Sequence, residues 1–291
     1  MSADTLQFID GRGYVWVNGS SGQTLIRFKP DGSGHENVCT AATGGQGISR
    51  SVIVGDICYA DVYYAQDRLG SDVEGICEIS LKTGDVALIA MSNEGSGWSE
   101  HQIKSLYFEE GALFYQLTEY RSGEARSRFY TYDCSKKENA LLYETDHAAA
   151  ITKMDNTLIC YEYMVYGMDR AEESVWLFSL EDGSRSPLSI PFGSPSWDGE
   201  HLFITTIGQE DVRVYVFDSD FRAVTEIVPT LDPALGFIVR HTLKDHVVFT
   251  QRWLYDDDPA LYATTCQLYP KSLLTDPSGS AFEVTILPET D

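Results

Sequence analysis

Apolar and polar residues alternate along most of the chain, and clusters of turn-forming residues interrupt the alternation at regular intervals. Alternation with a period of two is typical of strands with one buried face, whereas an amphipathic helix repeats every 3.6 residues. Gly, Asn and Asp in the interruptions tolerate the positive φ that tight hairpins require. Helical periodicity is nearly absent. The pattern therefore predicts an all-β protein.

The turns and the strands that follow them recur six times. Successive repeats begin roughly 43 to 55 residues apart, which is the spacing of propeller blades. Each repeat continues into a third strand with a polar turn, such as Ile79–Asp85, and then into a fourth strand. The six openings are Gly11–Val17, Gly55–Tyr59, Glu110–Tyr115, Asp155–Cys160, Asp198–Phe203 and Lys244–Phe249.

A four-stranded sheet of this kind cannot bury both of its faces alone, but copies stacked around an axis bury them against one another. We therefore predict a six-bladed β-propeller of four-stranded antiparallel blades that forms a single domain over residues 1–291. Each blade is expected to close within its own segment, with no strand exchanged between the termini. The expected blades are 4–45, 46–93, 99–146, 147–190, 191–230 and 235–291.

The polar turn after the third strand has a recurring form. Residues Phe28–Gly34 read Phe-Lys-Pro-Asp-Gly-Ser-Gly, and Leu81–Asp85 and Leu180–Ser184 are similar. This strand-turn-Asp-Gly signature resembles that of TolB-like and LDL-receptor-like bacterial propeller repeat proteins of unknown function, although the Tyr-Trp-Thr-Asp motif of the receptor propellers is absent. The resemblance implies a periplasmic or extracellular binding module, and it carries no catalytic residues onto this chain.

Charge narrows the range of partners. The chain has 44 acidic and 21 basic residues, a formal net charge of -23. Such a surface repels phosphate backbones and anionic lipid, so neither nucleic acid nor membrane insertion is expected. Met1–Asp10 lacks the basic start and apolar stretch of a signal peptide. We expect a cytoplasmic protein if Met1 is the native start; the alternative is an exported or membrane-anchored protein whose targeting segment has been removed.

The sequence offers no cofactor motif. None of the six cysteines lies in a Cys-x-x-Cys pair, which argues against a zinc or dithiol site, and each lies in a strand-like run. We therefore predict buried, reduced thiols and no cofactor. Acid-rich connections between second and third strands have oxygen ligands for calcium but not the spacing of an EF-hand, so the sequence does not decide whether a metal ion binds. The cysteines are Cys39, Cys58, Cys77, Cys134, Cys160 and Cys266.

Two sets of polar residues fall in the strands expected to be innermost. The first strands carry Arg50, Lys104, Lys153 and Arg240, with His241 beside the last. A buried cation costs several kcal/mol unless it is paired, so these bases face a wet channel, pair with acids or bind an anionic ligand. The second strands carry a column that either bonds neighbouring blades or rings the channel mouth. It consists of Asn18, Asp61, Gln116, Tyr161, Thr205 and Thr250, with Glu162 and Arg252 beside it.

The charge pattern favours binding. We predict a non-catalytic binding or scaffold propeller that recognises a protein, a peptide or a small anionic ligand at the channel mouth. The expected ligand-binding residues are Arg50, Asp61, Lys104, Lys153, Arg240 and His241, and the expected acidic rim is Asp256, Asp257 and Asp258.

The alternative is a propeller enzyme, a lyase or hydrolase acting on an anionic sugar or peptide. His101 and His147 precede the first strands of the third and fourth blades. In a propeller, connections at this point share one face with those between second and third strands, and that face often binds the ligand. A histidine beside a carboxylate there can act as acid and base. The sequence has no Gly-x-Ser-x-Gly elbow, which disfavours a serine hydrolase.

Overall fold

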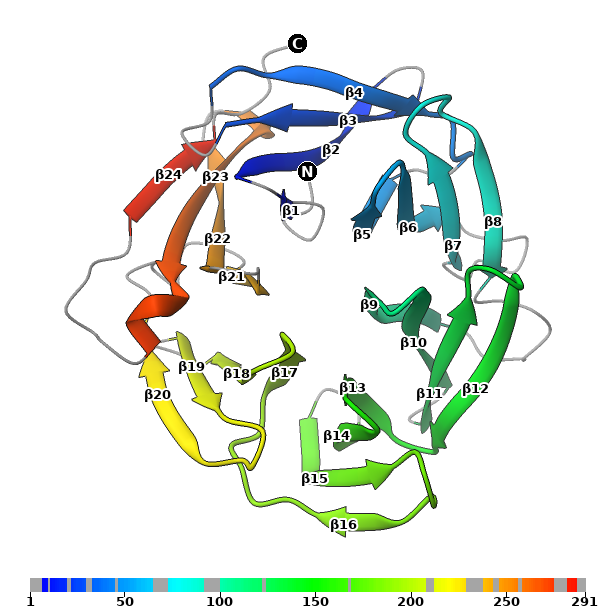
Figure 1. The fold of residues 1–291 in the computed structure, drawn as a ribbon, viewed down its shortest axis with the longest axis vertical. Coiled ribbons are helices and arrows are strands. Elements are labelled where there is room, and N and C mark those ends of the chain that lie inside the picture. Colours follow the sequence, from blue (N-terminus) through cyan, green and yellow to red (C-terminus); the bar gives the residue numbers. More distant parts are fainter. Residues whose placement is uncertain are drawn as a thin grey trace. The chain divides into compact units, whose positions relative to one another are not determined.

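The computed structural model describes most of the chain as β-strands (Figure 1). The described residues are 7–9, 11–19, 22–29, 33–44, 47–64, 73–91, 100–121, 124–166, 169–207, 212–228, 238–242, 246–255, 258–274 and 282–286. They form six four-stranded antiparallel sheets, and each sheet is built from four strands that are consecutive in sequence. Each sheet lies inside one of the six predicted segments.

Three of the sheets lie in the middle of the chain. The first contains β5 (Gly47–Val54), β6 (Ile57–Tyr64), β7 (Val73–Ser80) and β8 (Val86–Met91). The second contains β9 (Glu100–Glu109), β10 (Ala112–Arg121), β11 (Glu124–Asp133) and β12 (Glu138–Thr145). The third contains β13 (Ala148–Met154), β14 (Thr157–Tyr166), β15 (Asp169–Ser179) and β16 (Arg185–Pro187).

The other sheets come from the two ends of the chain. One contains β1 (Gln7–Ile9), β2 (Arg12–Gly19), β3 (Gly22–Phe28) and β4 (Glu36–Ala41). Another contains β17 (Ser194–Trp197), β18 (Leu202–Ile207), β19 (Val212–Phe217) and β20 (Ala223–Ile227). The last contains β21 (Ile238–Thr242), β22 (His246–Tyr255), β23 (Asp258–Pro270) and β24 (Phe282–Ile286). A short 3-10 helix, η3 (Lys271–Leu274), follows β23, and the repeat pattern did not predict it.

The turn residues adopt the backbone conformations for which they were expected. Glu110 and Gly111, between β9 and β10, have φ values of 49° and 85°. Two consecutive residues with positive φ are typical of the type I′ hairpin, whose twist matches that of the strands. Gly183, in the turn after β15, has a φ of 71°. These two turns therefore use glycine to reach a backbone conformation that other residues rarely adopt.

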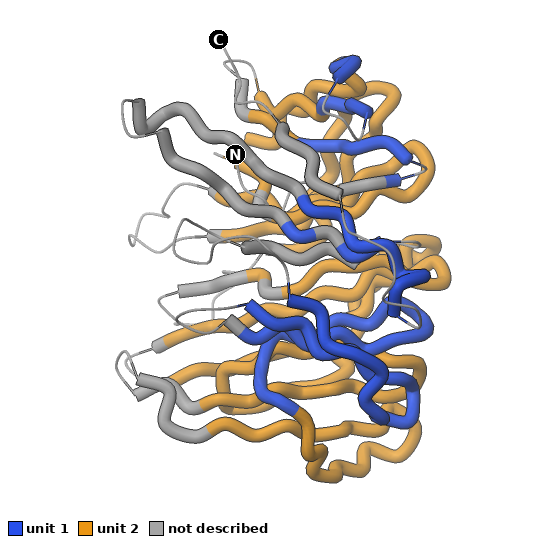
Figure 2. The backbone as a smooth tube through the Cα atoms, turned by 90° about the vertical axis from the view of Figure 1, so that its left-hand side faces the viewer, with its two compact units in different colours: residues 1–15, 26–36, 191–291 blue, residues 16–25, 37–190 orange. Residues whose placement is uncertain are grey.

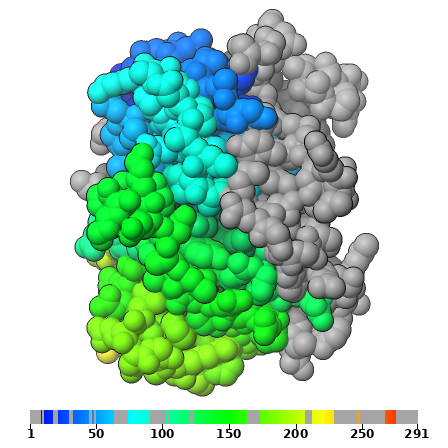
Figure 3. Space-filling view, turned by 90° about the vertical axis from the view of Figure 1, so that its right-hand side faces the viewer, coloured from blue at the N-terminus to red at the C-terminus, as the bar shows by residue number. Residues whose placement is uncertain are grey.

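Contacts divide the chain into two compact units (Figure 2). Unit 1 comprises residues 1–15, 26–36 and 191–291, and unit 2 comprises residues 16–25 and 37–190. Sheets β5–β8, β9–β12 and β13–β16 belong wholly to unit 2. Their surfaces follow one another in cyan, green and yellow-green along one face of that unit (Figure 3).

The cores of unit 2 lie where its sheets pack face to face. One core joins β5–β8 to β9–β12 through side chains such as Tyr59, Ile76 and Leu113. The next joins β9–β12 to β13–β16 through Phe129 and Leu158, among others. Each large apolar side chain removed from water contributes roughly 1.5–3 kcal/mol. Stacking the sheets thus buries the faces that a single sheet leaves exposed.

The core of unit 1 is built in the same way. Phe203, Val214 and Val216 from β17–β20 pack against Val247 and Phe249 of β22. Leu274 of η3 is buried in the same cluster, so the 3-10 helix is held by apolar contacts.

Buried polar side chains join neighbouring sheets of unit 2. Gln116 of β10 donates from Nε2 to the carbonyl of Ala149 at 2.5 Å, and its Oε1 accepts from the backbone N–H of Ile151 at 2.9 Å. Ser127 Oγ accepts from the N–H of Ala149 at 2.9 Å. Edge-strand backbone groups that lack a strand partner are thereby satisfied. At Gln116, the predicted polar column bonds one sheet to the next.

Candidate functional site

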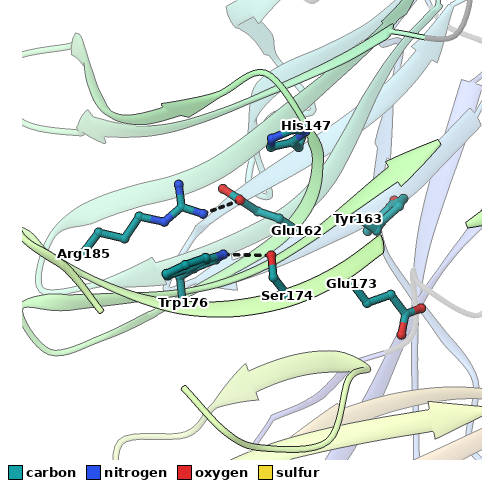
Figure 4. Close-up of a pocket in the computed structure, with 7 residues that line it drawn as sticks. All are labelled: His147, Glu162, Tyr163, Glu173, Ser174, Trp176 and Arg185. Carbon is teal, nitrogen blue, oxygen red and sulfur yellow. Dashed lines mark hydrogen bonds and ion pairs between the residues drawn. The ribbon is translucent and has the colours of Figure 1, made fainter. Parts of the chain in front are cut away.

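A cavity of about 440 Å³ opens on the sheet β13–β16 in unit 2 (Figure 4). Its lining comes from the connection that precedes β13 and from three strands of the sheet. The lining residues are His147, Glu162, Tyr163, Glu173, Ser174, Trp176 and Arg185.

Strand register brings these side chains together. In the antiparallel pair β14–β15, Cys160 lies opposite Trp176 and Glu162 lies opposite Ser174. Because side chains alternate between the two faces of a strand, Leu158, Cys160 and Glu162 point the same way. Leu158 and Cys160 are fully buried in the core shared with β9–β12. Glu162 therefore extends a buried apolar row.

Glu162 departs from the pattern of the repeat. Counted from the turn that opens each repeat, its position corresponds to two buried apolar residues, Val62 and Leu117, and to the uncharged residues Gly19, Thr206 and Gln251, so Glu162 is the charged exception. Glu162 is just as buried, with 3 % of its surface exposed. An ionised carboxylate in such a place costs several kcal/mol unless it is paired and hydrogen-bonded. A residue that the fold does not require, placed where it is costly, indicates a functional site.

The partners of Glu162 come from two sheets. Tyr143 of β12 donates its hydroxyl to Oε1 at 2.7 Å, and Arg185 of β16 donates from Nη2 to Oε2 at 2.5 Å. The Arg185 guanidinium also lies over the Trp176 ring, 4.1 Å from its centroid. Trp176 in turn donates from Nε1 to Ser174 Oγ at 2.8 Å. A carboxylate and an aromatic face thus hold the guanidinium in one orientation.

The wall behind Glu162 is uncharged at neutral pH. Burial raises the pKa of Tyr143 far above its ordinary value, and the nearby Cys160 and Glu162 raise it further. Burial also raises the pKa of Cys160 to about 12, with Glu162 adding to the effect. The phenol therefore stays protonated and serves as a hydrogen-bond donor to the carboxylate.

The arrangement leaves Arg185 able to bind a ligand. Its side chain is 37 % exposed, and no described residue accepts a hydrogen bond from its Nε or Nη1. An oriented guanidinium with donors to spare is the usual partner of a carboxylate. Tyr163 and Glu173 lie across Glu162 from Arg185, and His147 lies above it (Figure 4). Figure 4 marks two interactions among the seven residues, and neither involves His147.

The predicted ligand-binding residues that the structure describes lie outside this cavity. Arg50 of β5 contacts Asp61 of β6, with Nη1 and Oδ2 3.5 Å apart, and donates to the carbonyl of Ile103. Asp61 is fully buried. Lys153 pairs with Glu109 at 2.6 Å, and its ammonium lies 5.1 Å from the centroid of the Phe114 ring. Both bases pair with acids, one of the alternatives raised above, and their role in ligand binding stays a prediction.

The remaining predicted residues cannot be placed in the same detail. Lys104 belongs to β9, Arg240 and His241 belong to β21, and Asp258 begins β23, but their side chains lie outside the described residues. Asp256 and Asp257 lie outside the described part of the chain altogether.

The residues that build the cavity were only partly anticipated. His147 and Glu162 were noted for their positions, but Trp176 and Arg185 were not noted at all. The available signal was an acid at a position where the other five repeats carry uncharged residues. Its arginine partner is 23 positions away, on a strand of three residues, and no local pattern marks it.

A metal site and a membrane-spanning helix each require a particular arrangement of residues. Among the described residues, no group of three or more His, Cys, Asp or Glu side chains is arranged to hold a metal ion. No helix among them has the length and apolarity needed to cross a membrane.

Comparison with known proteins places the chain by fold. No protein-family model matches it, and no curated sequence does. An uncharacterized protein from Listeria monocytogenes is similar in structure, with a TM-score of 0.52 and 11 % identity over 99 % of this chain and 84 % of that one. The β-propeller domain of the Trilobed protease from Pyrococcus furiosus has a TM-score of 0.51 and 12 % identity over 94 % and 93 % of the two chains.

A third similar structure is that of the polysaccharide lyase Uly1, with a TM-score of 0.52 and 9 % identity over 86 % of each chain. At such low identity these likenesses show the fold alone. The chain is an all-β propeller protein with four-stranded antiparallel blades.

Proposed function

We propose that the protein is a non-catalytic binding module, a single six-bladed propeller over residues 1–291 whose fourth blade, β13–β16, recognises the carboxylate of a peptide or small anionic ligand. The carrying observation is Arg185, which a buried glutamate and an indole ring orient toward a cavity. The Asp-Gly turns, which resemble those of TolB-like and LDL-receptor-like repeats, support a binding role.

The preference for a carboxylate follows from the hydrogen bonds that Arg185 can still make. Only Nη2 is used by Glu162, so Nε and Nη1 can meet an incoming anion. Tyr163, Glu173 and His147 supply polar groups for the rest of the ligand. A cavity of about 440 Å³ suits a group of small-molecule size.

The net charge gives this proposal a distinctive salt dependence. A protein of charge -23 repels an anion at long range, and salt screens that repulsion. Binding of a carboxylate ligand should therefore hold or strengthen as salt rises toward physiological levels. A basic partner gripped by acidic loops would show the opposite trend.

The test compares ligands that differ only in the carboxylate. Isothermal titration is run with acetyl-dialanine and its C-terminal amide, and with tri-galacturonate and its methyl ester. We expect the free acids to bind and the capped forms to fail. In Arg185→Gln the affinity should fall about 10- to 100-fold, as charge-assisted hydrogen bonds contribute roughly 1.5–3 kcal/mol.

A matched control separates the site from a general charge effect. Arg213 forms an exposed ion pair with Glu226, at 2.7 Å, on the strands β19 and β20. Arg213→Gln makes the same change in net charge and should leave the affinity unchanged. Equal losses in the two variants, or equal binding of acids and capped forms, would contradict the proposal.

A second candidate function is catalysis on an anionic sugar or peptide. The observation that favours it is that His147, Tyr163 and Glu173 line the same cavity as Arg185. Together they offer a proton acceptor, a proton donor and a group that neutralises a carboxylate. One structural neighbour is the β-propeller domain of a protease, and another is a polysaccharide lyase.

Incubation with polygalacturonate and with peptide mixtures tests the second candidate. Elimination would take a proton from the carbon beside the carboxylate, expel the glycosidic oxygen with a proton, and leave an unsaturated product that absorbs ultraviolet light. Catalysis requires this product, or new peptide ends, at a rate that falls in His147→Gln. Binding without turnover would leave only the first function.

A further inference from the structure

Four charged side chains gather on a different blade, β9–β12. Glu119 comes from β10, Arg126 and Arg128 from β11, and Glu144 from β12. Strand register sets Glu119 opposite Arg126, and Arg128 opposite Glu144. We call these four residues the charge quartet. The cavity of β13–β16 includes none of them.

Hydrogen bonds join Glu119 to both arginines of the charge quartet. Glu119 is 1 % exposed, and its Oε2 accepts from Arg126 Nε at 3.1 Å and Nη2 at 2.8 Å, and also from Arg128 Nη2. Arg128 Nη1 donates to the hydroxyl of Tyr130 at 3.0 Å. Glu119 and Tyr130 therefore orient the two guanidinium groups without help from Glu144.

Glu144, the fourth residue of the charge quartet, is held less closely than Glu119. Glu144 Oε1 lies 3.7 Å from Arg126 Nη1 and 3.9 Å from Arg128 Nε, beyond hydrogen-bonding distance, and its side chain is 41 % exposed. Arg128 Nε is buried and has no hydrogen-bond partner among the described residues. Leaving a buried donor unsatisfied costs about 1–3 kcal/mol. Glu144 thus balances charge beside the two arginines without hydrogen bonding to either of them.

The position of Arg128 is filled differently from blade to blade. Arg128 lies opposite Leu117, and the corresponding residues are Gly75 in β7, Ser174 in β15 and Arg213 in β19. Arg213 is 44 % exposed, whereas Arg128 is 20 % exposed and its Nε is buried without a hydrogen-bond partner among the described residues. A largely buried arginine with an unmet donor needs an explanation of its own.

We propose that Arg126 and Arg128 form a second binding site, which takes a carboxylate from an acidic segment of a partner protein, and that this carboxylate displaces Glu144. Glu144 then acts as an internal stand-in that fills the site when the partner is absent. The incoming oxygen reaches Arg128 Nε, which Glu144 does not. The exchange costs little charge energy, because one carboxylate replaces another.

The overall charge favours a carboxylate over a phosphate. A carboxylate that takes the place of Glu144 keeps the local charge around the two arginines balanced and adds one negative charge to a chain of charge -23, whereas a phosphate dianion adds two. The proposal does not depend on the cavity of β13–β16, so either can fail alone.

The experiment removes the Glu144 carboxylate, which occupies the proposed site. The parent for this test is the full chain carrying Arg185→Gln, so that the proposed carboxylate site of β13–β16 does not contribute. This parent and its Glu144→Gln and Glu144→Ala derivatives are titrated with a fluorescent, acetylated peptide of alternating Glu and Gly. The expected result is about tenfold tighter binding by both derivatives, since the ligand no longer competes with Glu144. Glu226→Gln, which removes a similarly exposed carboxylate from an arginine pair, makes the same charge change and should leave binding at the level of the parent.

Arg128→Gln should abolish binding, and Arg128→Lys should weaken it while keeping the charge that Glu119 needs; thermal unfolding checks that both variants fold. The site is ruled out if the Glu144 variants bind no more tightly than Glu226→Gln, or if a peptide of Gln and Gly binds equally well. Inorganic phosphate that competes better than free glutamate would overturn the carboxylate assignment.

Discussion

At the scale of single residues, the candidate site lies where one residue, Glu162, differs from its equivalents in the other repeats. Val62 and Leu117 show what the fold accepts at one position of the second strand, and Glu162 is buried there at a cost. Tyr143 and Arg185 offset that cost through hydrogen bonds. The site thus depends on a phenol whose pKa burial keeps high.

Removing that phenolic donor should destabilise the protein. In Tyr143→Phe, Glu162 loses a hydrogen bond to a charged, buried oxygen, and we expect a loss of about 1.5–3 kcal/mol in the free energy of unfolding. Denaturant titration measures it. The matched control is Tyr115→Phe, because Tyr115 donates to the neutral amide of Asn139 at 3.0 Å and should cost about 1 kcal/mol or less. Equal losses would mean that Glu162 gains nothing special from Tyr143.

Cysteine reactivity is a second property set residue by residue. The five cysteines that the structure describes are free thiols, and only Cys134 among them is partly exposed. Burial raises the pKa of Cys58 and of Cys160 to about 12. Because the thiolate is the reactive form, both should resist Ellman's reagent at pH 8.

In the native protein Cys134 is expected to react first among the described cysteines, and all six thiols should react in guanidinium chloride. A disulfide in the native protein, detected by mass spectrometry, would contradict this and indicate export.

At the scale of elements, the sheets are held by polar links as well as by apolar cores. Gln116 and Ser127 bind the backbone of β13 in unit 2. In unit 1, Lys271 of η3 pairs with Asp198, which precedes β18 and also accepts from the N–H groups of His201 and Glu200. This pair links η3, which follows β23 in one sheet, to the turn between β17 and β18 in another.

The pair between Lys271 and Asp198 should make stability depend on pH. Burial alone would raise the pKa of Asp198, but Lys271 and the two backbone N–H groups outweigh it and lower the pKa below its ordinary 3.8. A lowered folded-state pKa stabilises the protein above the unfolded-state value and loses that effect as pH falls through the folded-state value.

Lys271→Gln should therefore melt at a lower temperature than the wild type at pH 7, and the difference should shrink below about pH 4. Lys82→Gln removes an exposed pair with Asp56 and should show no such trend. A difference for Lys271→Gln that is constant from pH 7 to pH 3 would refute the electrostatic explanation.

At the scale of the whole molecule, the repeat and the contacts divide the chain differently. Contacts give two compact units, and the repeat gives six similar segments. In repeat proteins, stability is the sum of each repeat and its interfaces with its neighbours. We propose a single propeller, which predicts one cooperative unfolding transition.

Calorimetry tests that prediction. One transition is expected, with a calorimetric enthalpy equal to the van't Hoff enthalpy. Two separated transitions, or independent folding of residues 191–291, would mean that the units defined by contacts are separate domains.

Local chemistry in the sequence determined the class of fold and the strands. Alternation and turn residues depend on near neighbours, so the start of β18 within the opening Asp198–Phe203 and the hairpin at Gly111 were both foreseeable. Tertiary structure alone decided the partners. Lys153 meets Glu109 across 44 positions and Arg185 meets Glu162 across 23. Such pairs depend on how sheets stack and on register, where a slip of one residue turns every side chain to the opposite face.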